Sequence, residues 1–195
     1  MGKILIGIDE AGMGTLAGPV TAAVVVIDTD DVPPGVRDSK VMGDEQREEL
    51  AAKIMEAAFA FKTGYRTPEL IDKCGISACW EGLMQELACY GDMVNSLSLC
   101  GAEIIVDGNR FIPNYPKVRP VVKADATHPA VSAASILAKY VQCCWMDDYH
   151  KEYPRYGFNH HRGYGTPEHM FTLKEFGPCP IHRRSYKPIK RLLSR

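Results

Sequence analysis

The stretch that most constrains the fold is GIDEAGMGTLAGPV, residues 7–20, because it joins two apolar runs. Residues 3–8 and the β-branched residues 20–27 are typical of buried strands. Between them, GMGTLA has the G-x-G-x-x-A spacing of a dinucleotide-binding loop. That loop must lead into a helix whose N-terminus binds the phosphates, whereas this one leads through Gly-Pro into a strand. Two acids, Asp9 and Glu10, also precede it, so the sequence excludes a dinucleotide cradle, and the absence of G-K-[S/T] excludes a P-loop.

Acidic residues end three of the predicted strands. Asp9 and Glu10 follow the first strand, Asp107 ends a strand over 103–107, and Asp125 ends one over 118–125. If these strands are neighbours, the carboxylates converge and repel one another unless cations bind between them. Oxygen ligands of this kind favour Mg²⁺ or Mn²⁺, and two such ions can hydrolyse a phosphodiester. The residues therefore predict a two-metal phosphodiesterase.

The remaining pattern alternates strands and helices, which favours a single α/β domain over residues 1–195. No repeat, low-complexity tract or clear linker interrupts it. A further strand is predicted over 59–66. Helices are predicted over 44–59, from Pro68, over 76–95, over 129–148, and from Thr166-Pro167 to near Gly177.

The charge is unevenly distributed along the chain. Residues 155–195 contain nine Lys or Arg and two Asp or Glu, a net charge of +7, whereas the first 154 residues contain 14 and 22, a net charge of −8. A basic, helical C-terminal part from about residue 150 favours an anionic partner such as nucleic acid. A solvated surface segment explains the same charges equally well.

Cysteine usage and hydropathy indicate the compartment. The seven cysteines form no C-x-x-C pair and no zinc-type spacing with histidine, which favours buried thiols in a reducing cytosol. No segment approaches the roughly 20 apolar residues of a membrane span, and the first residues lack a signal-peptide pattern. We expect a cytoplasmic protein without a membrane partner.

Six blocks of the sequence resemble the ribonuclease HII family, and they occur in that family's order over nearly the whole chain. They are GIDEAGMGTLAGPV, DSK at 38–40, VDGN at 106–109, VVKADATHPAVSAASILAKY at 121–140, YGFNHHRGYGTPEH at 156–169 and HRRSYKPIK at 182–190.

This resemblance implies a ribonuclease H-like fold, with a mixed central sheet flanked by helices and a C-terminal helical extension that helps to hold the duplex. It implies endonucleolytic hydrolysis of RNA in RNA–DNA hybrids and incision 5′ to ribonucleotides embedded in duplex DNA. The products would carry 3′-hydroxyl and 5′-phosphate ends. The cofactors would be two Mg²⁺ or Mn²⁺ ions, and we expect a monomer.

The four catalytic acids of the family fall on Asp9, Glu10, Asp107 and Asp125. Our hypothesis for the ions is that Asp9 would bridge both of them. Glu10 and Asp107 would help to hold the ion that activates the attacking water, and Asp125 would hold the ion on the leaving-group side.

The substrate contacts implied by the resemblance begin with the glycine loop, whose backbone reads the 2′-hydroxyl of the ribonucleotide. The family pattern in this loop is G-R-G, and this chain has methionine in place of the arginine. A tyrosine in HRGYG would stack on the sugar, and four polar residues would contact phosphates. The residues concerned are Gly12, Met13, Gly14, Ser39, Lys40, Tyr164, Arg183 and Arg184.

Two alternatives remain open from the residues. One is a non-catalytic protein that binds hybrids, which the presence of all four acids disfavours. The other is a nuclease or integrase of the same broad fold that acts on DNA, which would cut an all-DNA duplex as readily as a hybrid.

Overall fold

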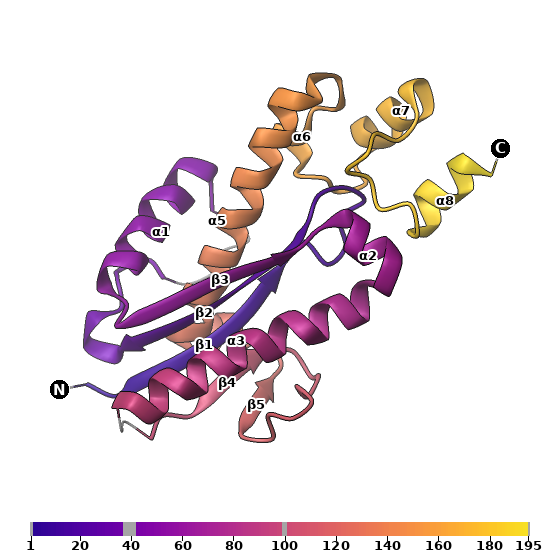
Figure 1. Cartoon of the computed structure of the whole chain (residues 1–195). Helices are drawn as coiled ribbons and strands as arrows, with labels where there is room; N and C mark the ends of the chain where they lie inside the picture. The colour runs from indigo at the N-terminus through magenta and orange to yellow at the C-terminus, as the bar shows by residue number, and fades with distance from the viewer. Residues whose placement is uncertain (1, 37–41, 99–100, 195) are drawn as a thin grey trace.

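A computed structural model describes residues 2–36, 42–98 and 101–194. In this structure five strands form one sheet in the order β3-β2-β1-β4-β5 (Figure 1). Neighbouring strands are antiparallel in the β1–β2 and β2–β3 pairs and parallel in the β1–β4 and β4–β5 pairs. The strands are β1 (Ile4–Ala11), β2 (Val20–Asp28), β3 (Ala60–Arg66), β4 (Ile104–Asp107) and β5 (Val118–Val121).

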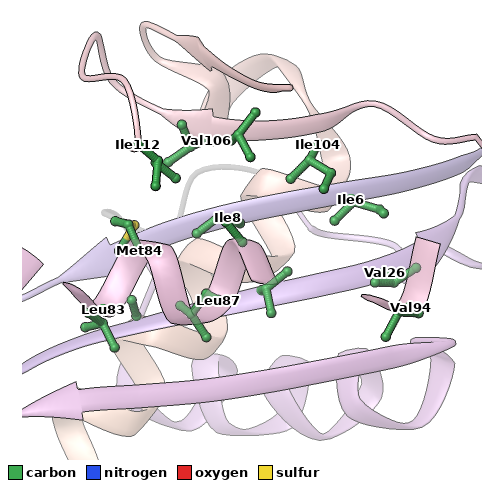
Figure 2. Close-up of a cluster of buried hydrophobic side chains, with 14 of the residues drawn as sticks. Ile6, Ile8, Val26, Leu83, Met84, Leu87, Val94, Ile104, Val106 and Ile112 are labelled. Carbon is green, nitrogen blue, oxygen red and sulfur yellow. The ribbon is translucent and has the colours of Figure 1, made fainter. Parts of the chain in front are cut away.

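Helices cover both faces of the sheet. The helix α3 (Ile76–Ser98) packs on one face, and α5 (Pro129–Glu152) packs on the other with α1 (Asp44–Ala57) beside it. Alternating side chains of β1 serve the two sides: Ile6 and Ile8 join the cluster beneath α3, shown in Figure 2, and Leu5 packs against the α5 cluster. The period-two alternation of a central strand explains why one sequence run lines two cores.

Gly7 lets α5 cross close to β1. A Cβ built on this glycine would lie 2.3 Å from the backbone of Ala130 and Val131, so no side chain fits there. The first turns of α5 therefore lie against the strand that carries Asp9, two residues further on the same face. This close approach brings residues of α5 to the candidate site.

The C-terminal segments lie beyond the end of the sheet, next to the loop that joins β1 to β2 (Figure 1). Three backbone hydrogen bonds connect them: Leu16 N–H to Gly163 O at 2.7 Å, Gly18 N–H to Ile181 O at 3.0 Å, and Arg183 N–H to Leu16 O at 2.9 Å. The remaining elements are the 3₁₀ turns η1 (Thr29–Asp31) and η2 (Pro154–Tyr156) and the helices α2 (Pro68–Cys74), α4 (Ala124–Thr127), α6 (Phe158–His161), α7 (Pro167–Phe176) and α8 (Lys187–Leu193).

The predicted fold class is confirmed, and two strand boundaries were wrong. The strand β1 does not stop at residue 8, because its ladder with β2 continues through the pair Ala11–Thr21. The strand β5 ends at Val121 instead of reaching Asp125. Lys123 then adopts a left-handed conformation, with φ of 58°, and the short helix α4 starts after it.

Two further observations concern the length and hydropathy of the helices and the state of the cysteines. In the described part of the chain, no helix is long and apolar enough to cross a membrane. The six cysteines within the described ranges all have free thiols, three of them buried, namely Cys79, Cys143 and Cys179. These three agree with the expected use of cysteine as a small core residue, whereas Cys74, Cys89 and Cys144 are exposed, so the expectation of burial is wrong for them.

Candidate active site

The two acids of β1 lie on opposite faces of the sheet. Asp9 is only 5% exposed and lies on the α5 face, where it forms a hydrogen bond with Ser135. Glu10 lies on the α3 face, where the indole N–H of Trp80 donates to its Oε2 at 3.1 Å. Because successive side chains of a strand point to alternate faces, Asp9 and Glu10 lie on the two sides of the sheet near its end. Both acids are part of the strand, and its ladder with β2 continues to Ala11, two positions beyond Asp9.

Asp107 lies beside Asp9. The parallel register pairs Ile8 with Val106, so the next residues along the two strands are these two acids. Their carboxylates interact, since Asp107 contributes to a raised pKa of Asp9. The adjacency of two acids at one sheet edge confirms that the ends of β1 and β4 converge.

Asp125 reaches this edge from a helix, which corrects its predicted place at a strand end. It lies in the first turn of α4 and is 8% exposed. The Oδ1 of Asp107 accepts a hydrogen bond from the backbone N–H of Ala124 at 2.7 Å, so one acid holds the helix that carries another. The Ser132 hydroxyl donates to the backbone carbonyl of Asp125 and ties α4 to α5.

A cleft of about 410 Å³ opens beside these acids. Its wall is formed by the end of β1, the glycine loop, α1, α5 and the segment before α7. The residues that line it are Glu10, Ala11, Gly12, Met13, Gly14, Arg47, Ser135, Lys139 and Tyr164. One cleft is therefore shared by Glu10, the glycine loop and Tyr164, the tyrosine predicted to stack on the sugar. Tyr164 is 42% exposed.

A match to a family model assigns the chain to a protein family. The model described as Ribonuclease HII matches residues 6–189. The chain belongs to the ribonuclease HII family. Ribonuclease HII of Bordetella pertussis (strain Tohama I) is 44% identical over 187 residues, which are 96% of this chain and 90% of that protein. The chain is thus a metal-dependent endonuclease of the ribonuclease H class, a group that acts on RNA in RNA–DNA hybrids.

Solved structures agree with this membership. Ribonuclease HII in its complex with PCNA from Archaeoglobus fulgidus has a TM-score of 0.76 at 28% identity, covering 96% of this chain and 95% of that one. The ribonuclease HIII called Bst-RNase HIII, solved in complex with Mn²⁺, has a TM-score of 0.70 over 98% of this chain and 70% of that one. At 20% identity the second likeness shows the fold alone.

The electrostatics of this candidate site favour a cation. Burial raises the pKa of Asp9 well above its usual range, and the charges of Glu10 and Asp107 raise it further. Burial also raises the pKa of Glu10, Asp107 adds to this, and Trp80 and Arg110 oppose it. Carboxylates that resist joint ionisation are stabilised as anions by a bound divalent ion.

The donor set fits Mg²⁺ or Mn²⁺, since all four candidate ligands are carboxylates. Within the described ranges, no three His, Cys, Asp or Glu side chains already enclose an ion position. Mg²⁺ does not require such a cage, because it keeps several waters and is held by one or two carboxylates together with substrate phosphates. An open set of carboxylates at a cleft is consistent with that type of binding.

Met13 is partly buried: it packs against core residues and also lines the cleft. Its side chain lies against the clusters of α2 and α3, which include Ile71 and Cys79. Its carbonyl oxygen accepts hydrogen bonds from Tyr186 Oη at 2.7 Å and Arg183 Nη1 at 3.2 Å. The residue that departs from the family pattern therefore anchors the glycine loop to the core and to the C-terminal segment.

The prediction that Arg183 contacts phosphate is corrected. Arg183 is fully buried, and its Nε donates to Gly18 O at 2.9 Å while its Nη1 also reaches Tyr186. A charged side chain with these buried carbonyl acceptors holds both ends of the glycine loop in place. Arg184 is exposed, and its backbone N–H donates to Asp72 at 2.8 Å. Ser39 and Lys40 lie outside the described residues.

Three residues of the cleft were missed by the sequence reasoning: Arg47, Ser135 and Lys139. Lys139 lies with its Nζ 5.0 Å from the ring centre of Tyr164 and donates to Gln142 at 2.6 Å. Burial lowers the pKa of this lysine. Ser135 and Lys139 are four residues apart on α5, so their helical spacing was a signal that they share one face.

Proposed function

We propose that this chain cleaves RNA in hybrids and also incises 5′ to ribonucleotides embedded in duplex DNA, through two-metal hydrolysis that leaves 3′-hydroxyl and 5′-phosphate ends. The whole chain would act as one catalytic domain, since the C-terminal segments hydrogen bond to the loop after β1. The observation that carries the proposal is the shared cleft, in which Glu10 and the backbone of Gly12 and Gly14 line one space.

In this proposal the four acids Asp9, Glu10, Asp107 and Asp125 hold the ions. Bound there, Mg²⁺ or Mn²⁺ supplies activation of a water and neutralises the charge that develops on the leaving oxygen. The protein supplies the fixed positions: Ser135 and Trp80 form hydrogen bonds with Asp9 and Glu10, and Asp107 accepts one from the helix that carries Asp125. Rigid orientation of this kind lowers the reorganisation that the reaction requires.

Recognition of the ribonucleotide would fall to the opposite side of the cleft. Gly14 has open space around it, with no atom within 4 Å of a Cβ built there, so a sugar can approach its backbone closely. The exposed ring of Tyr164 offers a stacking surface for that sugar, and Lys139 holds a positive charge next to the ring. A 2′-hydroxyl is the group that distinguishes RNA from DNA at such a position.

Positive side chains at the cleft would bind the phosphates on either side of the reaction centre. Lys139 lines the cleft itself, and the exposed Arg184 follows the buried Arg183 in the C-terminal segment. Arg47 also lines the cleft, but it is buried and already pairs with Asp44 and the carbonyl oxygen of Met42, so we do not assign it a phosphate. Phosphate contacts of this kind position the duplex without reading its sequence. The enzyme should therefore cut with little dependence on base sequence.

The test is a labelled DNA duplex with one embedded ribonucleotide, incubated with Mg²⁺ and separately with Mn²⁺, with the cut position mapped. An RNA–DNA hybrid and an all-DNA duplex of the same sequence serve as matched substrates. We expect one cut on the 5′ side of the ribonucleotide, cuts along the RNA of the hybrid, and none in the all-DNA duplex.

Other outcomes would contradict the proposal in different ways. Cleavage of the hybrid without cleavage at the embedded ribonucleotide would show that the chain lacks the proposed incision activity. Equal cleavage of the all-DNA duplex would indicate a DNA nuclease, and binding without cleavage under both metals would indicate a hybrid-binding protein.

A further inference from the structure

Glu10 has one hydrogen-bond donor that belongs to a helix far away in the sequence. Trp80, near the start of α3, donates its indole N–H to Oε2 of Glu10 at 3.1 Å, across 70 positions of the chain. An indole N–H can only donate, and it cannot bind a metal ion. The bond therefore occupies one carboxylate oxygen of Glu10 without competing for a cation at the other.

Trp80 is itself held from a third element. The guanidinium carbon of Arg110 lies 4.1 Å from the centre of the indole ring, which is cation–π geometry. Arg110 is exposed and belongs to the segment just after β4, three residues from Asp107. Trp80 is 3% exposed, so the ring lies between the core and this arginine.

We propose that Trp80 is a positioning residue for Glu10 and that Arg110 holds the indole in place, so that the pair sets the orientation of this carboxylate for the divalent ion. The inference rests on the proposed metal site. In this proposal Trp80 connects Glu10 of β1 to the segment that follows Asp107 of β4. The indole itself contacts neither substrate nor ion.

The physical reason is the freedom of an unsupported carboxylate. A glutamate side chain has three rotatable bonds, and an oxygen that accepts a fixed, nearly buried N–H loses most of that freedom. Partners that orient metal-binding carboxylates affect metal affinity strongly, and their loss commonly weakens it by 10-fold to 100-fold. The tryptophan is large enough to belong to the core as well, so the test must separate orientation from stability.

The experiment uses Trp80→Phe, which keeps an aromatic ring in the core cluster and removes the N–H donor. The chain has two tryptophans, and the matched control is Trp145→Phe, whose ring packs between Tyr65 and Tyr149 on α5. Mg²⁺ and Mn²⁺ binding is measured by titration calorimetry without substrate, and unfolding temperature is measured in EDTA. We expect Trp80→Phe to weaken metal binding about tenfold, and Trp145→Phe to leave it within twofold of the wild type.

A spectroscopic readout checks the same contact. In the Trp145→Phe protein the only tryptophan is Trp80, and its fluorescence should change and saturate as the metal binds beside Glu10. Arg110→Lys keeps the positive charge near Glu10 and replaces the planar guanidinium over the indole ring, so it tests this contact without disturbing the core, with an expected loss of metal affinity of about threefold.

The outcomes separate this proposal from the function it rests on. Unchanged metal affinity in Trp80→Phe, with or without a lower unfolding temperature, would overturn the positioning role alone. If that variant does not fold, unchanged affinity in Arg110→Lys together with a constant Trp80 fluorescence overturns it. A wild-type protein that binds neither ion would overturn the metal site as well.

Discussion

Asp107 accepts a hydrogen bond from the backbone N–H of Ala124 at 2.7 Å, and this bond connects the end of β4 to the helix that carries Asp125. One carboxylate therefore has two functions, as a candidate metal ligand and as the cap of the first turn of α4. An N–H at the start of a helix has no partner within the helix, so a side-chain acceptor stabilises it. The two functions can be separated by substitution.

Asp107→Asn keeps a side-chain oxygen for the Ala124 N–H and removes the charge, whereas Asp107→Ala removes both. We expect both variants to lose cleavage. In EDTA, Asp107→Asn should be at least as stable as the wild type, because it relieves repulsion with Asp9 and Glu10. Asp107→Ala should be less stable than Asp107→Asn by about 1 kcal/mol, or roughly 2–4 °C in thermal unfolding. Equal unfolding temperatures for the two variants would show that the cap contributes nothing.

The glycine loop offers a pair of substitutions that separates substrate approach from folding. A Cβ on Gly14 meets no atom within 4 Å, whereas a Cβ on Gly12 lies 2.8 Å from Gln142 Nε2, at a φ of +84°. Gly14→Ala should therefore leave the unfolding temperature unchanged and lower kcat/KM on the embedded ribonucleotide by about tenfold to a hundredfold, because the sugar is displaced from the backbone. Gly12→Ala should lower stability as well.

The measurement is kcat/KM on the single-ribonucleotide duplex, with the unfolding temperature of each variant beside it. Wild-type cleavage by Gly14→Ala would mean that no substrate group approaches this part of the loop.

Three buried histidines predict how stability depends on pH. Burial lowers the pKa of His169 to about 4 and that of His182 to about 3, and it also lowers the pKa of His161. Nε2 of His182 lies 3.0 Å from Nε2 of His169, whose Nδ1 lies 2.8 Å from the carbonyl oxygen of Tyr164. With Nδ1 of His182 accepting from the Cys179 N–H at 3.0 Å, one chain of neutral imidazoles links Cys179 to Tyr164.

In the unfolded chain His169 and His182 take up protons near pH 6.5, and in the folded protein these two do so only near pH 4 and below. The unfolded state thus binds more protons below pH 6.5, so their contribution to stability is complete above that pH and is lost as the pH falls toward 4. The effect should reach about 3 kcal/mol for His169 over this window. Chemical denaturation at pH 8, 6.5 and 5 measures it.

A variant isolates the histidines from the acids of the site. His169→Gln should be less stable than the wild type at pH 8 and should lose less stability between pH 6.5 and 5. The control, His160→Gln, changes an exposed residue of the same segment and should keep the wild-type slope. A wild-type slope in His169→Gln would contradict the assignment.

Patterns local in the sequence predicted much of this site. Alternation and β-branching located the buried strands, and an acid next to each strand end identified Asp9, Glu10 and Asp107. The position of Asp125 was wrong in detail, because the left-handed turn at Lys123 is not visible in residue spacing and converts an expected strand end into a helix start. The bond from the Ala124 N–H to Asp107 places its helix next to the end of β4.

Contacts between distant segments were not predictable. Trp80 and Glu10 are 70 positions apart, and no periodicity relates them. Arg183 belongs to a basic segment and was expected at the surface, whereas its acceptors, Gly18 O and Met13 O, become available only after the glycine loop folds against the C-terminal segment. Charge alone predicts exposure, and only tertiary structure supplies the partners that make burial favourable.

The central claim is that the acids of the sheet edge act in the chemistry and not in holding the duplex. The measurement is cleavage of the single-ribonucleotide duplex by Asp9→Asn in Mg²⁺, beside binding of the same duplex in EDTA, with Asp31→Asn as an exposed control. We predict that Asp9→Asn lowers the cleavage rate by at least about 10²-fold and leaves the Kd within about threefold, because the ions drive the reaction. Cleavage within tenfold of the wild type, or equal losses of cleavage and binding, would contradict the claim.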